Sequence, residues 1–324
     1  MSYLQAIVIA LVQGVTELFP VSSLGHSVLV PAWFGGSWQT LVTQSSQATS
    51  ESSFYLAFIV ALHCATALAL LWFFRLDWVR IVRGFLRSAQ RSVRERRFDT
   101  RDSDERLAWL IVLATIPVGL TGLALEHTFR TIFAKPTAAA AFLLVNGLVL
   151  LAGERARRRA AAAGLSGAGE RAEPQYAGAT SGRSADDVAA AAASDVRISR
   201  ISYRDSLSIG LLQILALFPG ISRAGITMVG GLWRGLDHED AARFAFLLAT
   251  PVILAAGVLK LPSLFGPAGD HIHGQVIVGS LVCGVTAYFT VRFLVRYFET
   301  RTLTPFAVYC LIAGAASLLR FTAF

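Results

Sequence analysis

The sequence predicts an all-α polytopic membrane protein that is built as an inverted-topology repeat. The first observation is composition: the 324 residues are 54% hydrophobic and only 15% charged, which is too apolar for a soluble globular domain. The second is that several apolar segments reach the roughly 20 residues that a membrane-crossing helix needs. The third is that two other apolar segments, one in each half, are broken in the same way by a proline, a serine and an ionisable residue.

Six segments are long and apolar enough to be complete transmembrane helices. We expect them at about 54–75, 107–126, 136–152, 243–261, 276–297 and 304–320. Segments 4–34 and 206–233 are also apolar, but Pro20 or Pro219 divides each into pieces too short to span alone. Each is therefore predicted to be a re-entrant helical hairpin, which is tolerated at membrane depth where protein buries its backbone.

The arginines are distributed as the orientation rule for membrane proteins requires. Nine arginines lie in 76–106 and nine more in 153–204, whereas 35–53 and 262–275 contain no Lys or Arg. Arg-rich loops stay in the cytoplasm, so six crossings leave both chain ends on the outer side. The net charge of +8 therefore indicates membrane orientation rather than a nucleic-acid partner.

The two halves of the chain are predicted to run in opposite senses. Residues 1–155 and 205–324 each hold one hairpin followed by three crossings, and three is odd, so the second half is inverted. Between them, 156–204 is predicted to be a flexible cytoplasmic loop, because it is rich in Ala, Gly, Ser and Arg. The hairpins then enter from opposite sides, and their Pro-Ser tips meet within the membrane.

The first break carries a carboxylate at membrane depth. Gln13 and Glu17 are four residues apart, so they share one face of a helix. A buried carboxylate is tolerated when it meets a cation, a metal or a proton donor. The structural alternative is a Glu17 held by an internal arginine for stability alone.

Hydroxyl and imidazole groups follow this carboxylate. Pro20 suits the first position of a new helix, which would place Ser22, Ser23 and His26 in the first two turns. Helix N-termini attract phosphate through free N–H groups and the positive dipole end. The structural alternative is a serine-rich cap beside a core histidine.

The second break repeats the arrangement with a cation. Gly220 allows close backbone approach, and Ser222, Arg223 and Thr227 follow it. The planar guanidinium of arginine binds phosphate oxygens in a bidentate manner. Arg223 could also neutralise Glu17 when no ligand is present. A carboxylate, a hydroxyl–imidazole pair and an arginine at two helix starts together predict a site for a phosphoryl group.

Other polar residues in the apolar segments are interpreted as structural. His63 is taken as a core histidine, and Asn146 as a hydrogen-bonding link between helices. Three scattered cysteines form neither a disulfide framework nor a zinc motif. They are therefore expected to be small core residues.

Two motifs of this chain resemble those of the undecaprenyl-diphosphate phosphatase family, the bacitracin-resistance proteins. The first is PVSSxGH with an upstream Glu/Gln motif, here Gln13, Glu17 and Pro20-Val21-Ser22-Ser23-Leu24-Gly25-His26. The second is PGxSRSxxT, here Pro219-Gly220-Ile221-Ser222-Arg223-Ala224-Gly225-Ile226-Thr227. The chain departs from the family pattern at two positions. Gln13 stands where a glutamate is frequent, and Ala224 replaces the second serine.

The resemblance implies hydrolysis of undecaprenyl diphosphate to undecaprenyl phosphate and inorganic phosphate. This reaction recycles the lipid carrier for peptidoglycan and cell-wall synthesis and confers bacitracin resistance. The implied place is the bacterial cytoplasmic membrane, with the active site facing outward. The expected partners are a polyprenyl diphosphate lipid and the bilayer, without nucleic acid, and a homodimer is compatible with the sequence.

The resemblance also implies roles for individual residues. The expected catalytic residues are Glu17, Ser23, His26 and Arg223. The expected substrate-binding residues are Gln13, Ser22, Gly220, Ser222 and Thr227. Glu17 and Gln13 would hold a divalent cation, Mg²⁺ or Ca²⁺, through oxygen ligands. The nucleophile stays open among His26, Ser23 and water.

Three rival functions are compared with this one. Inverted repeats with broken helices are also typical of transporters and lipid flippases, but a carrier would release no phosphate. Another type of membrane phosphatase carries PSGH and SRxxxxxH blocks, yet this chain has Val229 where the final histidine belongs. A purely structural scaffold leaves the ionisable groups at both breaks unexplained.

Overall fold

The computed structural model describes residues 1–47, 54–133, 135–163, 185–260 and 272–323. Within these ranges every regular element is a helix. In chain order the α-helices are α1 (Tyr3–Thr16), α2 (Ser23–Phe34), α3 (Gly36–Gln47), α4 (Phe54–Phe73), α5 (Arg75–Glu95), α6 (Ser103–Phe133), α7 (Pro136–Ala162), α8 (Ala185–Ser199), α9 (Tyr203–Leu212), α10 (Arg223–Trp233), α11 (His238–Lys260), α12 (His273–Thr300) and α13 (Thr304–Ala323). A 3-10 helix, η1 (Gln213–Leu217), follows α9.

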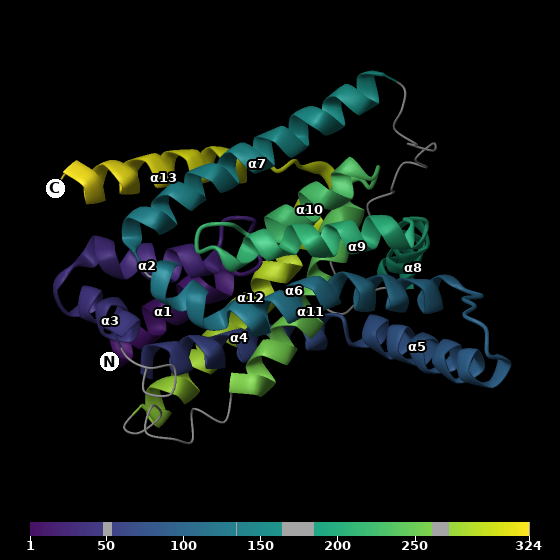
Figure 1. The fold of residues 1–324 in the computed structure, drawn as a ribbon, viewed down its shortest axis with the longest axis horizontal. Helices are drawn as coiled ribbons and strands as arrows, with labels where there is room; N and C mark the ends of the chain where they lie inside the picture. The colour runs from purple at the N-terminus through teal and green to yellow at the C-terminus, as the bar shows by residue number, and fades with distance from the viewer. Residues whose placement is uncertain (48–53, 134, 164–184, 261–271, 324) are drawn as a thin grey trace.

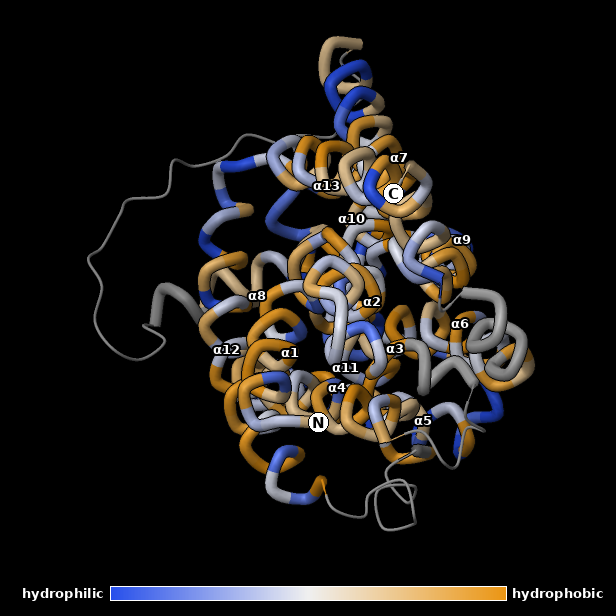
Figure 2. The backbone as a smooth tube through the Cα atoms, turned by 90° about the vertical axis from the view of Figure 1, so that its left-hand side faces the viewer, coloured by the Kyte–Doolittle hydropathy of each residue, from blue (hydrophilic) through white to orange (hydrophobic). Residues whose placement is uncertain are grey.

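The six predicted crossings are confirmed as helices. Six helices of the described chain are long and apolar enough to span a membrane, and each corresponds to one predicted segment. They are α4, the first part of α6, α7, α11, α12 and α13. Hydrophobic residues dominate these long helices in Figure 2. The all-helical membrane fold is therefore shown.

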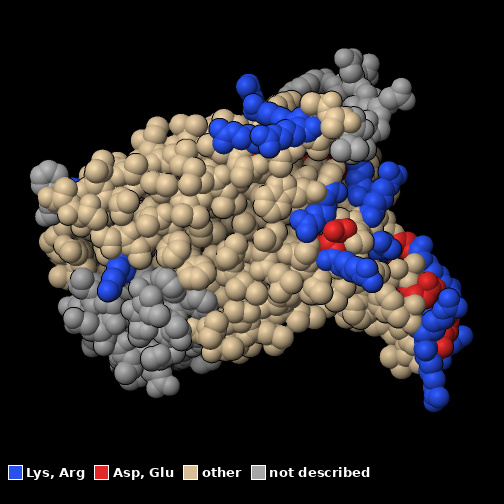
Figure 3. Space-filling model, turned by 45° about the horizontal axis from the view of Figure 1, so that its top comes forward, with Lys and Arg blue, Asp and Glu red and all other residues tan. Residues whose placement is uncertain are grey.

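The two ends of the molecule differ in charge. In Figure 1 both chain termini lie at the left, whereas α5 and the C-terminal end of α7 extend to the right. Figure 3 shows Lys and Arg gathered at one end of the visible face. Helix α5 alone carries Arg80, Arg83, Arg87, Arg91 and Arg94. The termini and the arginines thus lie at opposite ends of the molecule. The distribution of arginines among the loops predicts this arrangement.

The first break separates α1 from α2. Glu17 caps the C-terminus of α1, and Ser22 caps the N-terminus of α2 by accepting a hydrogen bond from Gly25 N. The expectation that Pro20 opens the second helix is wrong, because that helix starts at Ser23 and Pro20 lies in the turn. Ser22 has a φ of 72°, a strained value for a non-glycine residue. The chain thus needs a full turn of irregular backbone before the helix resumes.

The second break lies between η1 and α10. Ser222 caps α10 by accepting a hydrogen bond from Gly225 N at 3.1 Å. Gly220 has a φ of 117°, and a Cβ there would lie 2.5 Å from the Ala139 carbonyl oxygen. Only glycine therefore fits this position.

The two breaks touch each other. Gly220 N donates a hydrogen bond to Ser22 Oγ at 3.0 Å. Asn146 of α7 holds both sides, because its Nδ2 donates to Pro20 O at 2.9 Å and its Oδ1 accepts from Ser222 N at 3.0 Å. The predicted meeting of the Pro-Ser tips is thus observed, and Asn146 is a link between helices as expected.

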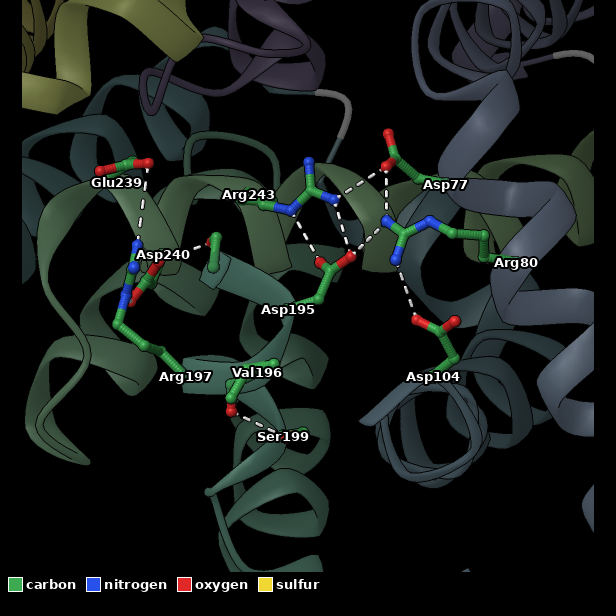
Figure 4. A network of polar contacts seen from close by, with 11 residues as sticks. Asp77, Arg80, Asp104, Asp195, Val196, Arg197, Ser199, Glu239, Asp240 and Arg243 are labelled. Carbon is green, nitrogen blue, oxygen red and sulfur yellow. Dashed lines mark hydrogen bonds and ion pairs between the residues drawn. The ribbon is translucent and has the colours of Figure 1, made fainter. Parts of the chain in front are cut away.

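Helix α8 lies within the stretch that the sequence assigns to a cytoplasmic loop. Its Asp195 is fully buried and accepts hydrogen bonds from Arg243 Nε at 2.8 Å and from Arg80 Nη2 at 2.7 Å. Figure 4 shows Asp195 between these two arginines, with Asp77 and Asp104 completing the network. Several hydrogen bonds to each charge offset the penalty of burying it. These ion pairs join α8 to α5 and α11.

Candidate active site

Glu17 lies at the centre of a buried polar cluster. Arg223 Nη2 donates to Glu17 Oε1 at 2.5 Å. The other carboxylate oxygen, Oε2, accepts from Gln13 Nε2 at 3.0 Å and from the hydroxyl of Ser23. His63 Nε2 lies 3.2 Å from the same oxygen. Three predicted site residues and one unpredicted histidine therefore meet at the carboxylate of a fourth predicted residue, Glu17.

The helix breaks explain why these side chains converge. Gln13 and Glu17 share one face of α1, as their spacing predicts. Ser23 and Arg223 are the first residues of α2 and α10. Because the two breaks are in contact, both helix starts point toward the end of α1. Arg223 and Glu17 meet although 206 positions separate them in the chain.

His63 also belongs to this cluster, although its interpretation as a core histidine did not include a contact with Glu17. Its ring is held from both sides: Nδ1 lies 2.8 Å from the Ile59 carbonyl oxygen, and Nε2 faces Glu17. The sequence carried one signal, since an ionisable residue within an apolar span is a functional candidate by default. No motif surrounds His63, and only the packing of α4 against α12 and α11 fixes its position.

Ser22, Ser222 and Gly220 form the junction between the two helix starts. Ser22 Oγ accepts from Gly25 N at 3.3 Å and from Gly220 N at 3.0 Å. Ser222 caps α10 and donates to Phe19 O at 3.4 Å. The two serine hydroxyls thus stabilise the breaks, and both lie beside the N–H groups that begin α2 and α10.

Thr227 is placed differently from the residues of the cluster. It is buried in the second turn of α10, with only 1% of its surface exposed. Among the described residues the structure shows no hydrogen bond between its hydroxyl and the Glu17 cluster.

His26 lies beside the Glu17 cluster with a separate set of partners. Its Nδ1 is 2.7 Å from the carbonyl oxygen of Ser22, and its Nε2 is 2.7 Å from the hydroxyl of Tyr309 on α13. Among the described contacts, Ser23 donates to Glu17 and not to this imidazole. Tyr309 could not be identified from the sequence, because a single tyrosine in the second turn of an apolar helix carries no local signal.

The arrangement is suited to bind an anion. The N-terminal ends of α2 and α10 meet and bring two positive dipole ends together. Arg223 adds a permanent charge, and its side chain is 20% exposed. An incoming phosphate can replace the Glu17 carboxylate as the partner of this guanidinium.

The residues present can supply two ligands to a divalent cation. Gln13 Oε1 is buried and has no hydrogen-bond partner in the structure, and it lies on the same side chain whose Nε2 contacts Glu17. The described part of the chain contains no group of three or more His, Cys, Asp or Glu that could hold a metal by itself. Magnesium commonly binds through one or two protein oxygens together with substrate phosphates. The cluster fits a cation on those terms.

Comparison with known proteins places these features in one family. A family model described as "Bacitracin resistance protein BacA" matches residues 6–316. An undecaprenyl-diphosphatase 2 of Frankia alni is 59% identical, with 99% of this chain and 98% of the relative covered. An undecaprenyl-diphosphatase of Mycolicibacterium paratuberculosis is 58% identical over 98% of this chain and 97% of the relative. One of Acidiphilium cryptum is 41% identical over 98% of each.

Proposed function

This chain belongs to the bacitracin resistance protein BacA family, and on that basis we propose that it is an undecaprenyl-diphosphatase. It hydrolyses undecaprenyl diphosphate to undecaprenyl phosphate and inorganic phosphate. The reaction recycles the lipid carrier for cell-wall synthesis and confers bacitracin resistance. The observation that carries the proposal is the contact of Arg223 with Glu17, 2.5 Å apart, which joins the two helix-break motifs into one anion site.

The protein is a multi-pass protein of the bacterial cell membrane, and we place its active site toward the outer side. The α1–α2 hairpin starts at the end of the molecule that holds both termini, opposite the arginine-rich end. If the arginines face the cytoplasm, this hairpin enters from outside. The diphosphate would then reach Glu17 and Arg223 from the outer leaflet while its prenyl chain stays in the bilayer.

The inverted repeat is supported by the packing of the helices. Pairing α1 with α9, α4 with α11, α6 with α12 and α7 with α13 relates the two halves. Under this pairing the contact of α1 with α12 corresponds to that of α9 with α6, and the contact of α4 with α12 to that of α11 with α6. The pairs α7–α13 and α4–α11 are each in contact and map onto themselves. Re-entrant hairpins at α1–α2 and α9–α10 follow from the same pairing.

In the proposed reaction Arg223 and the two helix N-termini bind the diphosphate and stabilise the charge that develops on its oxygens. Ser23 donates its hydroxyl hydrogen to Glu17, so Glu17 is placed to take a proton from Ser23 or from a water molecule at that position. The attacking oxygen then forms a bond to the terminal phosphorus as the bridging P–O bond breaks. If that oxygen belongs to Ser23, a water molecule must next attack the phosphoserine, so that the bond from phosphorus to Ser23 breaks and inorganic phosphate leaves. The bridging oxygen leaves on undecaprenyl phosphate.

A divalent cation is proposed to bind together with the substrate. Gln13 Oε1 and the Glu17 carboxylate would supply protein oxygens, and the diphosphate would supply the others. When bound, the cation would neutralise part of the phosphate charge. In this structure the Arg223 guanidinium donates a hydrogen bond to Glu17 Oε1. That oxygen would be available to a cation only when Arg223 binds the substrate instead.

All the contacts of the Glu17 cluster described above are made within one chain. The direct test is phosphate release by the detergent-purified protein from long-chain and short-chain prenyl diphosphates, with and without EDTA. The proposal expects release from the long-chain substrate that stops with EDTA. No release from either substrate would instead favour a lipid carrier.

A further inference from the structure

Tyr309 and His26 form a close pair between the two ends of the chain. The Tyr309 hydroxyl lies 2.7 Å from His26 Nε2 across 283 positions of sequence. The two rings stack with centroids 5.7 Å apart and planes inclined by 15°. His26 is 6% exposed, whereas Tyr309 is 46% exposed. Tyr309 therefore covers His26 on the side that opens to the surroundings.

The backbone of the first break determines which ring nitrogen of His26 donates. Nδ1 lies 2.7 Å from the Ser22 carbonyl oxygen, which can only accept, so Nδ1 carries a hydrogen. In the neutral ring Nε2 then carries none and accepts from the Tyr309 hydroxyl. The Ser22 carbonyl points at Nδ1 from a strained backbone conformation, in which Ser22 has a φ of 72°. The imidazole is thus held at both nitrogens in one tautomer.

The neighbours of Tyr309 anchor it to the same junction as the rest of the site. The next residue of α13, Cys310, accepts a weak hydrogen bond from Asn146 Nδ2 at 3.3 Å. Asn146 also binds Pro20 and Ser222 of the two breaks. Movement of α13 would therefore disturb the breaks and the imidazole together.

We propose that Tyr309 is a positioning residue for this site. It fixes the tautomer and orientation of His26 and covers Nε2 until substrate enters, which deepens the proposed function and rests on it. The Tyr309 hydroxyl acts only through His26, whose Nε2 then meets the diphosphate or the water that attacks it. No bond to Tyr309 forms or breaks during the reaction.

The test is Tyr309→Phe, which keeps the ring stack and removes the hydroxyl. We expect kcat for phosphate release to fall about tenfold, as loss of one hydrogen bond in the transition state would cause, with KM within about twofold. The matched control is Tyr297→Phe on α12, whose hydroxyl donates to Thr302 O at 3.4 Å. It should leave both constants unchanged.

A double-mutant cycle separates positioning from a general structural effect. If Tyr309 acts through His26, the Tyr309→Phe change costs nothing further in a His26→Gln background. An equal loss in both backgrounds would overturn the proposal, as would wild-type kcat in Tyr309→Phe alone.

Nitrogen NMR of the ¹⁵N-histidine-labelled full chain gives a readout that does not depend on activity. The chain has six histidines, so His26→Gln identifies the signals. We expect Nε2 of His26 to show a hydrogen-bonded acceptor signal that shifts in Tyr309→Phe while Nδ1 stays protonated. If the nitrogen signals of His26 were unchanged in Tyr309→Phe, the hydrogen bond between Tyr309 and His26 would be refuted. If the wild-type protein released no phosphate but this shift occurred, the proposed function would fail while the pair would stand.

Discussion

Arg223 Nη2 and Glu17 Oε1 lie 2.5 Å apart at the point where two interrupted helices meet. The pair shows how a buried carboxylate is tolerated in an apolar protein, because the half-buried Arg223 supplies the opposite charge. Each neutralises the other, and Gln13 and His63 add further contacts to the carboxylate. A phosphate group can replace the Glu17 carboxylate as the partner of the Arg223 guanidinium. The carboxylate oxygen is then free to accept a proton or to bind a cation.

Replacing Arg223 by Lys should lower phosphate release about tenfold or more. Lysine retains the charge but loses the planar fork that grips two phosphate oxygens. The matched control is Arg234→Lys at the other end of α10, where the arginine pairs with Asp205 at 3.3 Å. In steady-state kinetics Arg223→Lys should lose activity relative to the wild type, and Arg234→Lys should not. Equal activities of the two variants would show that the Arg223 guanidinium does not hold the phosphate as proposed.

Replacing Ser23 by Ala should lower kcat by about 100-fold or more, because its hydroxyl lies against Glu17 and starts α2. Ser27→Ala, one turn later, should retain most activity, since among the described residues that hydroxyl contacts the Ser23 carbonyl at 2.9 Å and not Glu17. Rapid-quench samples with labelled substrate would show phosphate on Ser23 if the route is covalent. Full activity of Ser23→Ala would exclude the hydroxyl from the chemistry.

Replacing His63 should lower kcat/KM, although His63 lies in neither of the two sequence motifs. Gln can still donate a hydrogen to Glu17, whereas Leu cannot. We expect His63→Leu to lose about tenfold in kcat/KM and His63→Gln to lose clearly less, because one buried hydrogen bond to a charged group is worth about that factor. Identical kinetics of the two variants would show that the 3.2 Å contact has no part in turnover.

Replacing Gln13 should change the response to divalent cations. Gln13→Glu adds a carboxylate beside Glu17 and should lower the Mg²⁺ concentration that gives half-maximal rate, and Gln13→Leu should raise it. Luminescence of bound Tb³⁺ would report cation binding without turnover. A cation dependence unaffected by both changes would place the cation away from Gln13.

Breaking the Asp195 network should destabilise the protein without changing its chemistry. Asp195→Asn removes one of the two buried carboxylates that pair with Arg243, whose side chain is 9% exposed, and leaves Asp77 as the other; loss of one member of such a pair costs about 3 kcal/mol. Asp99→Asn removes a surface partner of Arg101, both more than 40% exposed, and should cost under about 1 kcal/mol. Thermal unfolding in detergent measures the difference, and an equal effect of both changes would contradict it.

Much of the site could be predicted because its residues stand in local patterns. Gln13 and Glu17 are one turn apart, and Ser23 and Arg223 follow directly on helix breaks, so composition and spacing indicated them. His63 and Tyr309 could not be found this way, since each lies alone in an apolar helix and gains its role from a neighbour far along the chain. The start of α2 was also misplaced, because Pro20 favours a helix start but the contact between the breaks holds it in the turn.

The sequence by itself determined that the chain is a helical membrane protein with six crossings and two broken segments, because hydropathy, length and proline act over a few neighbouring residues. It also predicted a candidate site at those breaks. Only the tertiary structure decided which groups surround the carboxylate, that Asn146 ties the breaks together, and that a tyrosine of the last helix holds the histidine of the second. Such contacts depend on how distant helices pack, and packing is a property of the whole folded chain.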